Sequence, residues 1–209
     1  MMSNKLKISF AITCHNELEE LKRLIPFLLV FKEEQDEIVV LYDTTNGTED
    51  VLSFLGTYEH KIHVTGDSFE GNFADWKNKL TSYCGGDYII NIDADEMPHE
   101  ILMNNIHVIL EENPVDVVLV PRVNTVEGLT DAHIQKWGWQ VNEHGWVNWP
   151  DYQMRVYRND ESIRWQNKVH ETLIGHTTIS NLPLMEELAL YHPKTIDRQE
   201  KQNAYYNTL

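Results

Sequence analysis

The chain has 209 residues, which is enough for one sizeable hydrophobic core and short for two. Its 33 Asp and Glu residues outnumber its 17 Lys and Arg residues, and the net charge of −16 argues against nucleic acid as a partner because it repels phosphate backbones. Two cysteines are too few for a disulfide scaffold or a four-cysteine zinc site. We therefore expect a single domain over residues 1–209.

No apolar run approaches the roughly 20 residues of a membrane-spanning helix. The best candidate, LIPFLLVF at residues 24–31, is short and is typical of a helix face. Near the N-terminus, an apolar run ends in His-Asn-Glu at residues 15–17, without the small-residue cleavage pattern of a signal peptide. These features predict a cytoplasmic protein without a transmembrane segment.

Strand patterns alternate with helical patterns as far as residue 123. Runs of Val and Ile predict strands buried on both faces, and apolar residues three or four positions apart predict helices. This order predicts an α/β fold, with a mostly parallel central sheet covered by helices on both faces. The predicted strands are 6–13, 37–42, 61–65, 87–92 and 115–123, and the predicted helices are 17–31, 48–55 (with Thr48 as N-cap), 72–84 and 98–112.

The character of the sequence changes after residue 123. Residues 124–151 are rich in Trp, Asn, His and Gly and have weak periodicity. YQMRVYR (152–158) and LALYH (188–192) are typical of single strands, and residues 195–209 favour a helix. We therefore divide the domain into two halves, 1–123 and 124–209.

The stretch GDYIINIDADEMP (86–98) crowds three acids, Asp93, Asp95 and Glu96, at the end of a predicted central strand. Open α/β sheets bind their ligands at this end of their strands. If the chain stays extended, Asp93 and Asp95 point the same way and repel each other unless a cation lies between them. Their oxygen ligands select Mg²⁺ or Mn²⁺. Alternatively, the acids stabilise the N-terminus of the following helix.

Five segments follow one another along the chain: ITCHNE (12–17), VVLYDTTNGTEDV (39–51), GNFADWKN (71–78), GDYIINIDADE (86–96) and YQMRVYRNDESIRWQNKVHE (152–171). In this order they resemble the family 2 glycosyltransferases, which have the Rossmann-like A-type (GT-A) nucleotide-diphospho-sugar transferase fold. The last of them resembles the branch that includes the lipopolysaccharide-core glucosyltransferases. The resemblance covers residues 6 to about 206, but the second segment lacks the usual paired acids and serine, and Lys77 stands where an arginine is usual.

The resemblance implies that residues 1–123 bind a nucleotide-diphosphate sugar, with a UDP-sugar favoured, and that residues 124–209 bind the acceptor. The donor residues that it implies each have an ordinary structural alternative, such as shaping a strand-to-helix turn, acting as a turn acid or being a solvated lysine. They are Thr13, His15 and Glu17 beside the nucleotide, Asp43 at the base, Lys77 at the diphosphate and Asp93 near the ribose and metal.

The same resemblance makes Asp95 the direct ligand of a Mn²⁺ or Mg²⁺ cofactor. A late histidine often supplies a further ligand in this fold, and His192 lies at the end of a predicted strand. Its alternative is a strand-end histidine bonded to a backbone carbonyl.

Sugar transfer needs a group that removes the proton of the attacking acceptor hydroxyl. Glu171 is our candidate for this general base, with His170 beside it as an alternative. Glu171 could instead pair with Lys168 in a surface hairpin. The branch that the sequence resembles inverts the anomeric configuration in a single displacement.

Four tryptophans lie within residues 137–149, and indole faces suit the apolar faces of sugar rings. We expect Trp146 and Trp149 to bind the acceptor, although such a cluster is also typical of a small satellite core. Arg155 and Arg158 lie three positions apart on a predicted strand, so their side chains point to opposite faces. We expect Arg155 to face the acceptor cleft and Arg158 to pair with an acid.

Together these features predict a metal-dependent, inverting glycosyltransferase of polysaccharide biosynthesis that transfers a hexose to a glycan or lipid-linked acceptor. A nucleotidyltransferase of related fold is one alternative, but its first loop is usually glycine-rich and basic, unlike ITCHNE. A non-catalytic carbohydrate-binding module built on the tryptophans is the other.

Overall fold

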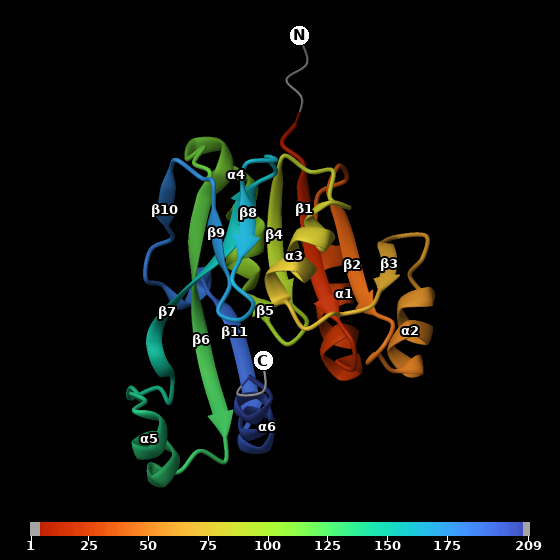
Figure 1. The fold of residues 1–209 in the computed structure, drawn as a ribbon. Coiled ribbons are helices and arrows are strands. Elements are labelled where there is room, and N and C mark those ends of the chain that lie inside the picture. The colour runs from red at the N-terminus through yellow and green to blue at the C-terminus, as the bar shows by residue number, and fades with distance from the viewer. Residues whose placement is uncertain (1–4, 207–209) are drawn as a thin grey trace.

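The computed structural model describes residues 5–206 and contains a central nine-stranded sheet (Figure 1). The strand order is β3-β2-β1-β4-β7-β6-β11-β5, and β10 pairs with β6. The strands are β1 (Ile8–Cys14), β2 (Glu37–Asp43), β3 (His63–Asp67), β4 (Tyr88–Asp93), β5 (Met97–Pro98), β6 (Val117–Glu127), β7 (Val147–Arg158), β10 (Ile179–Asn181) and β11 (Leu190–Thr195), with β8 (Arg164–Gln166) and β9 (Thr172–Ile174) in a separate hairpin. The helices are α1 (Leu18–Phe31), α2 (Glu49–Gly56), α3 (Phe73–Thr81), α4 (Glu100–Glu112), α5 (Asp131–Trp137) and α6 (Ile196–Tyr206), with a 3₁₀ turn at Glu186–Leu188.

The mostly parallel sheet predicted from the sequence is confirmed. Strands β1, β2, β3 and β4 are parallel, as are β6, β10 and β11, whereas β7 is antiparallel to both of its neighbours, β4 and β6. In register, Thr13 of β1 lies between Leu41 of β2 and Asp93 of β4. The carboxyl ends of three strands therefore meet at one edge, where polar side chains can gather.

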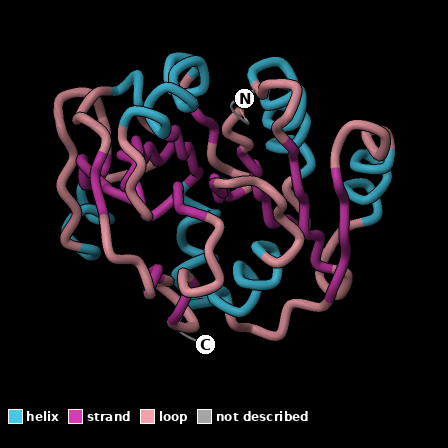
Figure 2. Tube along the Cα trace, turned by 90° about the horizontal axis from the view of Figure 1, so that it is seen from above, coloured by secondary structure: helices cyan, strands magenta, loops and turns pink. Residues whose placement is uncertain are grey.

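The period-two alternation of the strands sends side chains into two separate cores. One face of β1, with Phe10 and Ile12, packs against α1, α2 and α4, whereas Ala11 faces α3 and the β8–β9 hairpin. Figure 2 shows helices on both sides of the sheet, as the buried Val and Ile runs predict.

Local capping fixes where several helices begin. The Asn72 side chain accepts hydrogen bonds from the backbone N–H groups of Ala74 and Asp75 at the start of α3, and His99 accepts one from Ile101 at the start of α4. Thr48 occupies the N-cap position of α2, as predicted, but its side chain makes no capping hydrogen bond. None of the helices within residues 5–206 is both long and apolar enough to cross a membrane.

The weakly periodic segment after residue 123 does not start a new sheet. Strand β6 continues to Glu127, α5 follows, and β7 begins at Val147, earlier than the sequence predicts. We call residues 124–149 the arm; in Figure 1 it extends beyond the body of the sheet, beside α6. Residues 147–151 form a strand only because β7 pairs with β6. Their local sequence has no strand periodicity that would predict it.

Candidate active site

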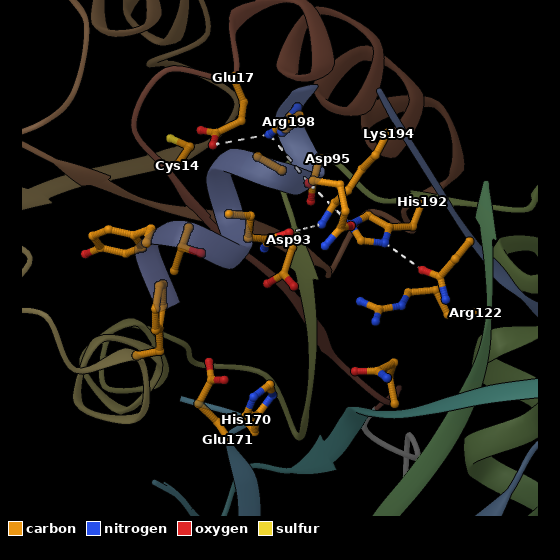
Figure 3. Close-up of a pocket in the computed structure, with 18 of the residues that line it drawn as sticks. Cys14, Glu17, Asp93, Asp95, Arg122, His170, Glu171, His192, Lys194 and Arg198 are labelled. Atoms are coloured by element: carbon orange, nitrogen blue, oxygen red, sulfur yellow. Dashed lines mark hydrogen bonds and ion pairs between the residues drawn. The ribbon is translucent and has the colours of Figure 1, made fainter. Parts of the chain in front are cut away.

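A cleft of about 990 Å³ opens at the carboxyl ends of β1, β2 and β4 (Figure 3). It is bounded by the arm, α6 and the loop between β8 and β9. Of the residues predicted for the site, Trp146 and Trp149 are not among the described residues that line it. The predicted residues that line it are Thr13, His15, Glu17, Asp43, Lys77, Asp93, Asp95, Arg155, His170, Glu171 and His192.

The two central acids do not point the same way. Strand β4 ends at Asp93, and the chain turns, with the N–H of Glu96 donating to the carbonyl oxygen of Asp93 over 2.8 Å. The extended chain on which the sequence prediction depended is therefore absent, and Asp93 and Asp95 bind different partners. The turn relieves their repulsion by giving each carboxylate its own cation.

Asp93 lies on a buried ion-pair network beneath the cleft. Its Oδ2 accepts a hydrogen bond from Nη2 of Arg155, and its Oδ1 lies 3.8 Å from Nζ of Lys77. Burial alone would raise the pKa of Asp93, but the charges of Arg155, Lys77 and Arg122 outweigh it and hold the pKa well below its usual range. Asp93 is therefore a fixed negative charge at the floor of the site.

Arg155 belongs to the same network. It is 3% exposed, and its Nη2 also donates to Oε1 of Glu96 over 2.6 Å. These contacts hold the guanidinium under the site, which does not fit the acceptor contact expected from the sequence. Arg158, its alternating neighbour, pairs with Asp116 across 3.6 Å, so both arginines are matched with acids.

Asp95 faces His192 on the wall of the cleft. Nε2 of His192 lies 3.3 Å from Oδ2 of Asp95, and Nδ1 lies 2.7 Å from Oδ1 of Asn124. The amide nitrogen of Asn124 donates to Asp151 over 2.8 Å, which leaves its Oδ1 as an acceptor and makes Nδ1 of His192 the donor. His192 thus bonds to a side chain and not to a backbone carbonyl, the alternative considered for it.

This orientation fits a divalent cation. A neutral imidazole that donates from Nδ1 presents the lone pair of Nε2 to Asp95, so that a cation between the two would have a nitrogen and an oxygen ligand. Within residues 5–206, no group of three or more His, Cys, Asp or Glu side chains is arranged to hold a metal ion. The remaining ligands would have to come from substrate oxygens or water.

Two cations from the C-terminal segment reach the same place. Nη2 of Arg198, on α6, lies 3.5 Å from Oδ2 of Asp95 and 3.7 Å from Oε1 of Glu17, contacts that Figure 3 shows. Lys194 lies on β11 just before α6, and burial lowers its pKa despite the opposing charge of Asp95. Positive charge therefore lies beside Asp95, where it can meet an anionic ligand.

The loop after β1 is organised by Glu17. Its Oε2 accepts hydrogen bonds from the N–H groups of His15 (2.8 Å) and Asn16 (3.1 Å), and its Oε1 lies 3.1 Å from Nδ1 of His15. These contacts make Glu17 a structural partner of this loop, and the hydrogen bond to Glu17 raises the pKa of His15.

Asp43 organises the loop after β2 in a similar way. Its Oδ1 accepts from the N–H groups of Thr45 and Phe69 over 2.9 and 3.3 Å, and its Oδ2 accepts from the side chain of Asn46 over 2.7 Å. Gly47 is required here because a Cβ would lie 2.2 Å from the Asp43 carbonyl oxygen. Asp43 thus acts as a turn acid in this structure, while its carboxylate still lines the cleft.

Glu171 and His170 lie across the cleft from Asp95 and His192 (Figure 3). Oε1 of Glu171 is 3.1 Å from Nζ of Lys77, which also lies 4.7 Å from the centre of the Trp165 ring. Lys77 is only 8% exposed, so it is not the solvated surface lysine considered from the sequence. His170 has a left-handed backbone, with a φ of 55°, a conformation that is uncommon outside glycine and concentrates at functional sites.

The tryptophans of the arm form two pairs. Trp146 and Trp149 have ring centres 4.9 Å apart, and Trp137 and Trp139 have ring centres 4.6 Å apart. Trp139 lines the cleft, and Trp137 packs beside α6. The structure therefore brings a different tryptophan to the site from the two that the sequence suggested.

Sequence reasoning missed several polar residues of the cleft. The sequence holds a partial signal for their positions. Alternate residues of β6 share one face of the sheet, and residues four apart on α6 lie on the same side of the helix. Neither period shows that β6 and α6 approach β4, since these contacts join distant segments. The missed residues include Arg122, Asn124, Lys194 and Arg198.

The fold is that of an α/β protein with a cleft at the carboxyl ends of its parallel strands, the edge at which proteins of this class bind ligands. The model of the family described as "Glycosyl transferase family 2" matches residues 9–180, so the chain belongs to glycosyl transferase family 2. A search of curated proteins found no match.

Solved structures show the same fold. The structure of S. aureus TarS 1–349 in complex with UDP is 16% identical, with a TM-score of 0.61 over 90% of this chain and 60% of that one. The complex of the same protein with UDP-GlcNAc gives 16% identity and a TM-score of 0.60 over 90% and 59%. The predicted GT-A fold is thereby confirmed, and the chain spans about 60% of the length of these structures. The resemblance to the lipopolysaccharide-core branch stays a prediction.

Proposed function

We propose that the protein is a metal-dependent, inverting glycosyltransferase that moves a hexose from a nucleotide-diphosphate sugar to a glycan or lipid-linked acceptor. The observation that carries this proposal is the arrangement of one cleft, with Asp95 and His192 on one wall and Glu171 across from them. The family supports the reaction class. UDP and UDP-GlcNAc in the TarS structures support a UDP-sugar as donor.

The donor would lie between the ends of β1, β2 and β4. Thr13 and the His15–Glu17 loop border its nucleotide side, and the carboxylate of Asp43 borders the base. Lys194 and Arg198 lie beside Asp95, where they would bind the diphosphate. Because Arg198 already contacts Asp95 and Glu17, we expect it to exchange these carboxylates for phosphate when the donor enters.

Asp95 and His192 would hold Mn²⁺ or Mg²⁺, and Asp93 would add negative charge behind them. The bound cation would neutralise the charge that grows on the leaving diphosphate. The Asn124 side chain would keep Nε2 of His192 directed at the cation, because it occupies Nδ1.

Glu171 would take the proton of the acceptor hydroxyl as the oxygen attacks the anomeric carbon. In the same displacement the bond from that carbon to the diphosphate oxygen breaks, and its electron pair leaves with the nucleotide. Lys77, 3.1 Å from Glu171, would hold the carboxylate in place. One displacement inverts the anomeric configuration.

Calorimetric titration with UDP, with and without Mn²⁺, tests the proposal. We expect metal-dependent binding that Asp95→Ala removes while its circular dichroism stays native, and we expect metal-dependent hydrolysis of at least one nucleotide sugar. UDP binding that is equally strong with and without Mn²⁺ would reject the metal role of Asp95. Full activity of Asp95→Ala at any metal concentration would reject it as well. Release of pyrophosphate would favour a nucleotidyltransferase, and sugar binding without nucleotide binding would favour a carbohydrate-binding module.

A further inference from the structure

The cleft contributes nothing to the chain's large negative charge. It is lined by six Lys or Arg and six Asp or Glu residues, so the whole net charge of −16 lies elsewhere on the chain. Most of the basic side chains in the cleft are paired with acids, as Arg155 is with Asp93 and Lys77 with Glu171. An anionic acceptor would therefore approach through repulsive potential and find few uncommitted cations.

Part of the cleft is not needed by a nucleotide. Where it meets the arm it is lined by Thr125, Trp139 and Asn148, and α6 adds Gln202 and Tyr205 together with one basic residue, Lys201. Aromatic rings and uncharged amides of this kind suit the apolar faces and hydroxyls of sugars. Residues 124–149 of the arm include three acids and one lysine, a poor composition for binding phosphate or carboxylate.

The arm holds Trp139 in place before any ligand binds. The N–H of Gln140 donates to Oδ1 of Asn148 over 2.9 Å, and the N–H of Asn148 donates to the carbonyl oxygen of Gln140 over 2.7 Å. The N–H of Trp139 donates to the carbonyl oxygen of Ile134, and its ring packs on Trp137. Preorganisation of this kind reduces the entropy lost when a ligand binds.

This end of the cleft is joined to the catalytic end by continuous structure. His192, Asn124 and Val147 form a row across β11, β6 and β7, so Val147 lies roughly 10 Å from His192 at the usual strand spacing. Val147 and Met154 of β7 pair with Asn124 and Leu119 of β6, which are five residues apart, so this stretch of β7 spans roughly 17 Å at the usual rise. The sulfur of Met154 accepts a hydrogen bond over 3.2 Å from the N–H of Leu173, two residues from Glu171.

We propose that the acceptor is an extended, uncharged glycan that lies along β7, with one sugar on Trp139 and its reacting hydroxyl at Glu171. A single sugar cannot reach both ends, so affinity should rise with glycan length. This inference rests on the proposed glycosyl transfer, and it replaces Trp146 and Trp149 with Trp139 as the stacking residue.

A glycan array tests it, with the protein loaded with UDP and Mn²⁺ and the array carrying neutral and acidic glycans from monosaccharides to long oligosaccharides. We expect neutral oligosaccharides to bind best, and Trp139→Ala to lose at least about tenfold in affinity, down to the level of a monosaccharide. Trp139→Phe should retain most of the binding. His144→Ala, which removes an exposed aromatic side chain from the same arm, is the matched control.

Several outcomes would overturn the inference. They are stronger binding of acidic glycans, no binding of any neutral glycan, or an unchanged length dependence in Trp139→Ala. A loss in Trp146→Ala without one in Trp139→Ala would assign the acceptor to the outer tryptophan pair. Calorimetry with UDP and Mn²⁺ separates this inference from the proposed function, because Trp139→Ala should bind UDP as the wild type does, whereas failure of the wild type to do so would reject the function itself.

Discussion

His192 and Asn124 face each other across β11 and β6, with Nδ1 of the imidazole 2.7 Å from Oδ1 of the amide. Asp151 fixes the amide by accepting from its nitrogen, and Arg122 in turn donates to Asp151 over 2.7 and 2.9 Å. The orientation of His192 toward Asp95 is therefore set by a chain of side chains behind it. Such outer contacts commonly decide how well a histidine binds a metal.

Asn124→Ala should weaken Mn²⁺ binding in the presence of UDP by roughly 10- to 100-fold, because His192 loses the partner that fixes its ring. His192→Ala should weaken it at least as much. Calorimetric Mn²⁺ titration measures both, and Asn105→Ala, on the exposed face of α4, is the control. An unchanged titration in Asn124→Ala would show that the amide does not position the histidine.

Glu171→Gln should lower the rate of transfer by roughly 10² to 10⁴, because an amide keeps the shape of the carboxylate but cannot accept the proton. UDP affinity should stay close to that of the wild type, since Lys77 remains near Asp93. Steady-state kinetics with calorimetry measures the two effects, and Glu161→Gln, an exposed change before the same hairpin, is the control. If Glu171→Gln also loses UDP binding, Glu171 is part of the donor site. If it keeps full transfer activity, Glu171 is not the general base, and His170 becomes the next candidate.

Glu96→Ala should destabilise the fold by about 3–5 kcal/mol, because it leaves the buried guanidinium of Arg155 and the partly buried one of Arg122 without their shared partner. Oε1 of Glu96 accepts from Arg155 over 2.6 Å and from Arg122 over 2.9 Å. Urea unfolding measures the free energy, and exposed Glu70→Ala should change it by less than about 0.5 kcal/mol. A loss as small as that of the control would show that water or rearrangement compensates the arginines.

His107 should make stability depend on pH. Its Nε2 lies 2.9 Å from Oδ2 of buried Asp36, and this hydrogen bond raises the pKa of His107 above 6.5. A raised pKa in the folded state gives stability that is fully present below about pH 6.5 and is lost as the pH rises through the folded value. The Tm advantage of the wild type over His107→Gln should therefore shrink from pH 6 to about pH 8.5.

Thermal unfolding at the two pH values measures this difference. His60→Gln serves as the control, since its side chain is 91% exposed. An advantage that is constant or that grows with pH would contradict the assignment.

The sequence by itself determined the order of strands and helices in the first half, because each buried strand and amphipathic helix carries its own local period. It also determined that Asp93 and Asp95 lie at a ligand-binding edge, since every parallel strand of such a sheet ends on the same side. Six of the residues expected in the site line one cleft for this reason, namely Thr13, His15, Glu17, Asp43, Asp93 and Asp95.

Tertiary structure alone decided what each acid does. Asp93, Asp95 and Glu96 lie within four residues of one another in the sequence, yet Asp93 and Glu96 pair with Arg155 while Asp95 faces His192. It also decided that Trp139, and not Trp146, reaches the cleft, and that Arg198 of α6 contacts Asp95. These contacts join residues that are far apart in the chain. They depend on the geometry of a turn and on the register between strands, and neither produces a periodic pattern in the sequence.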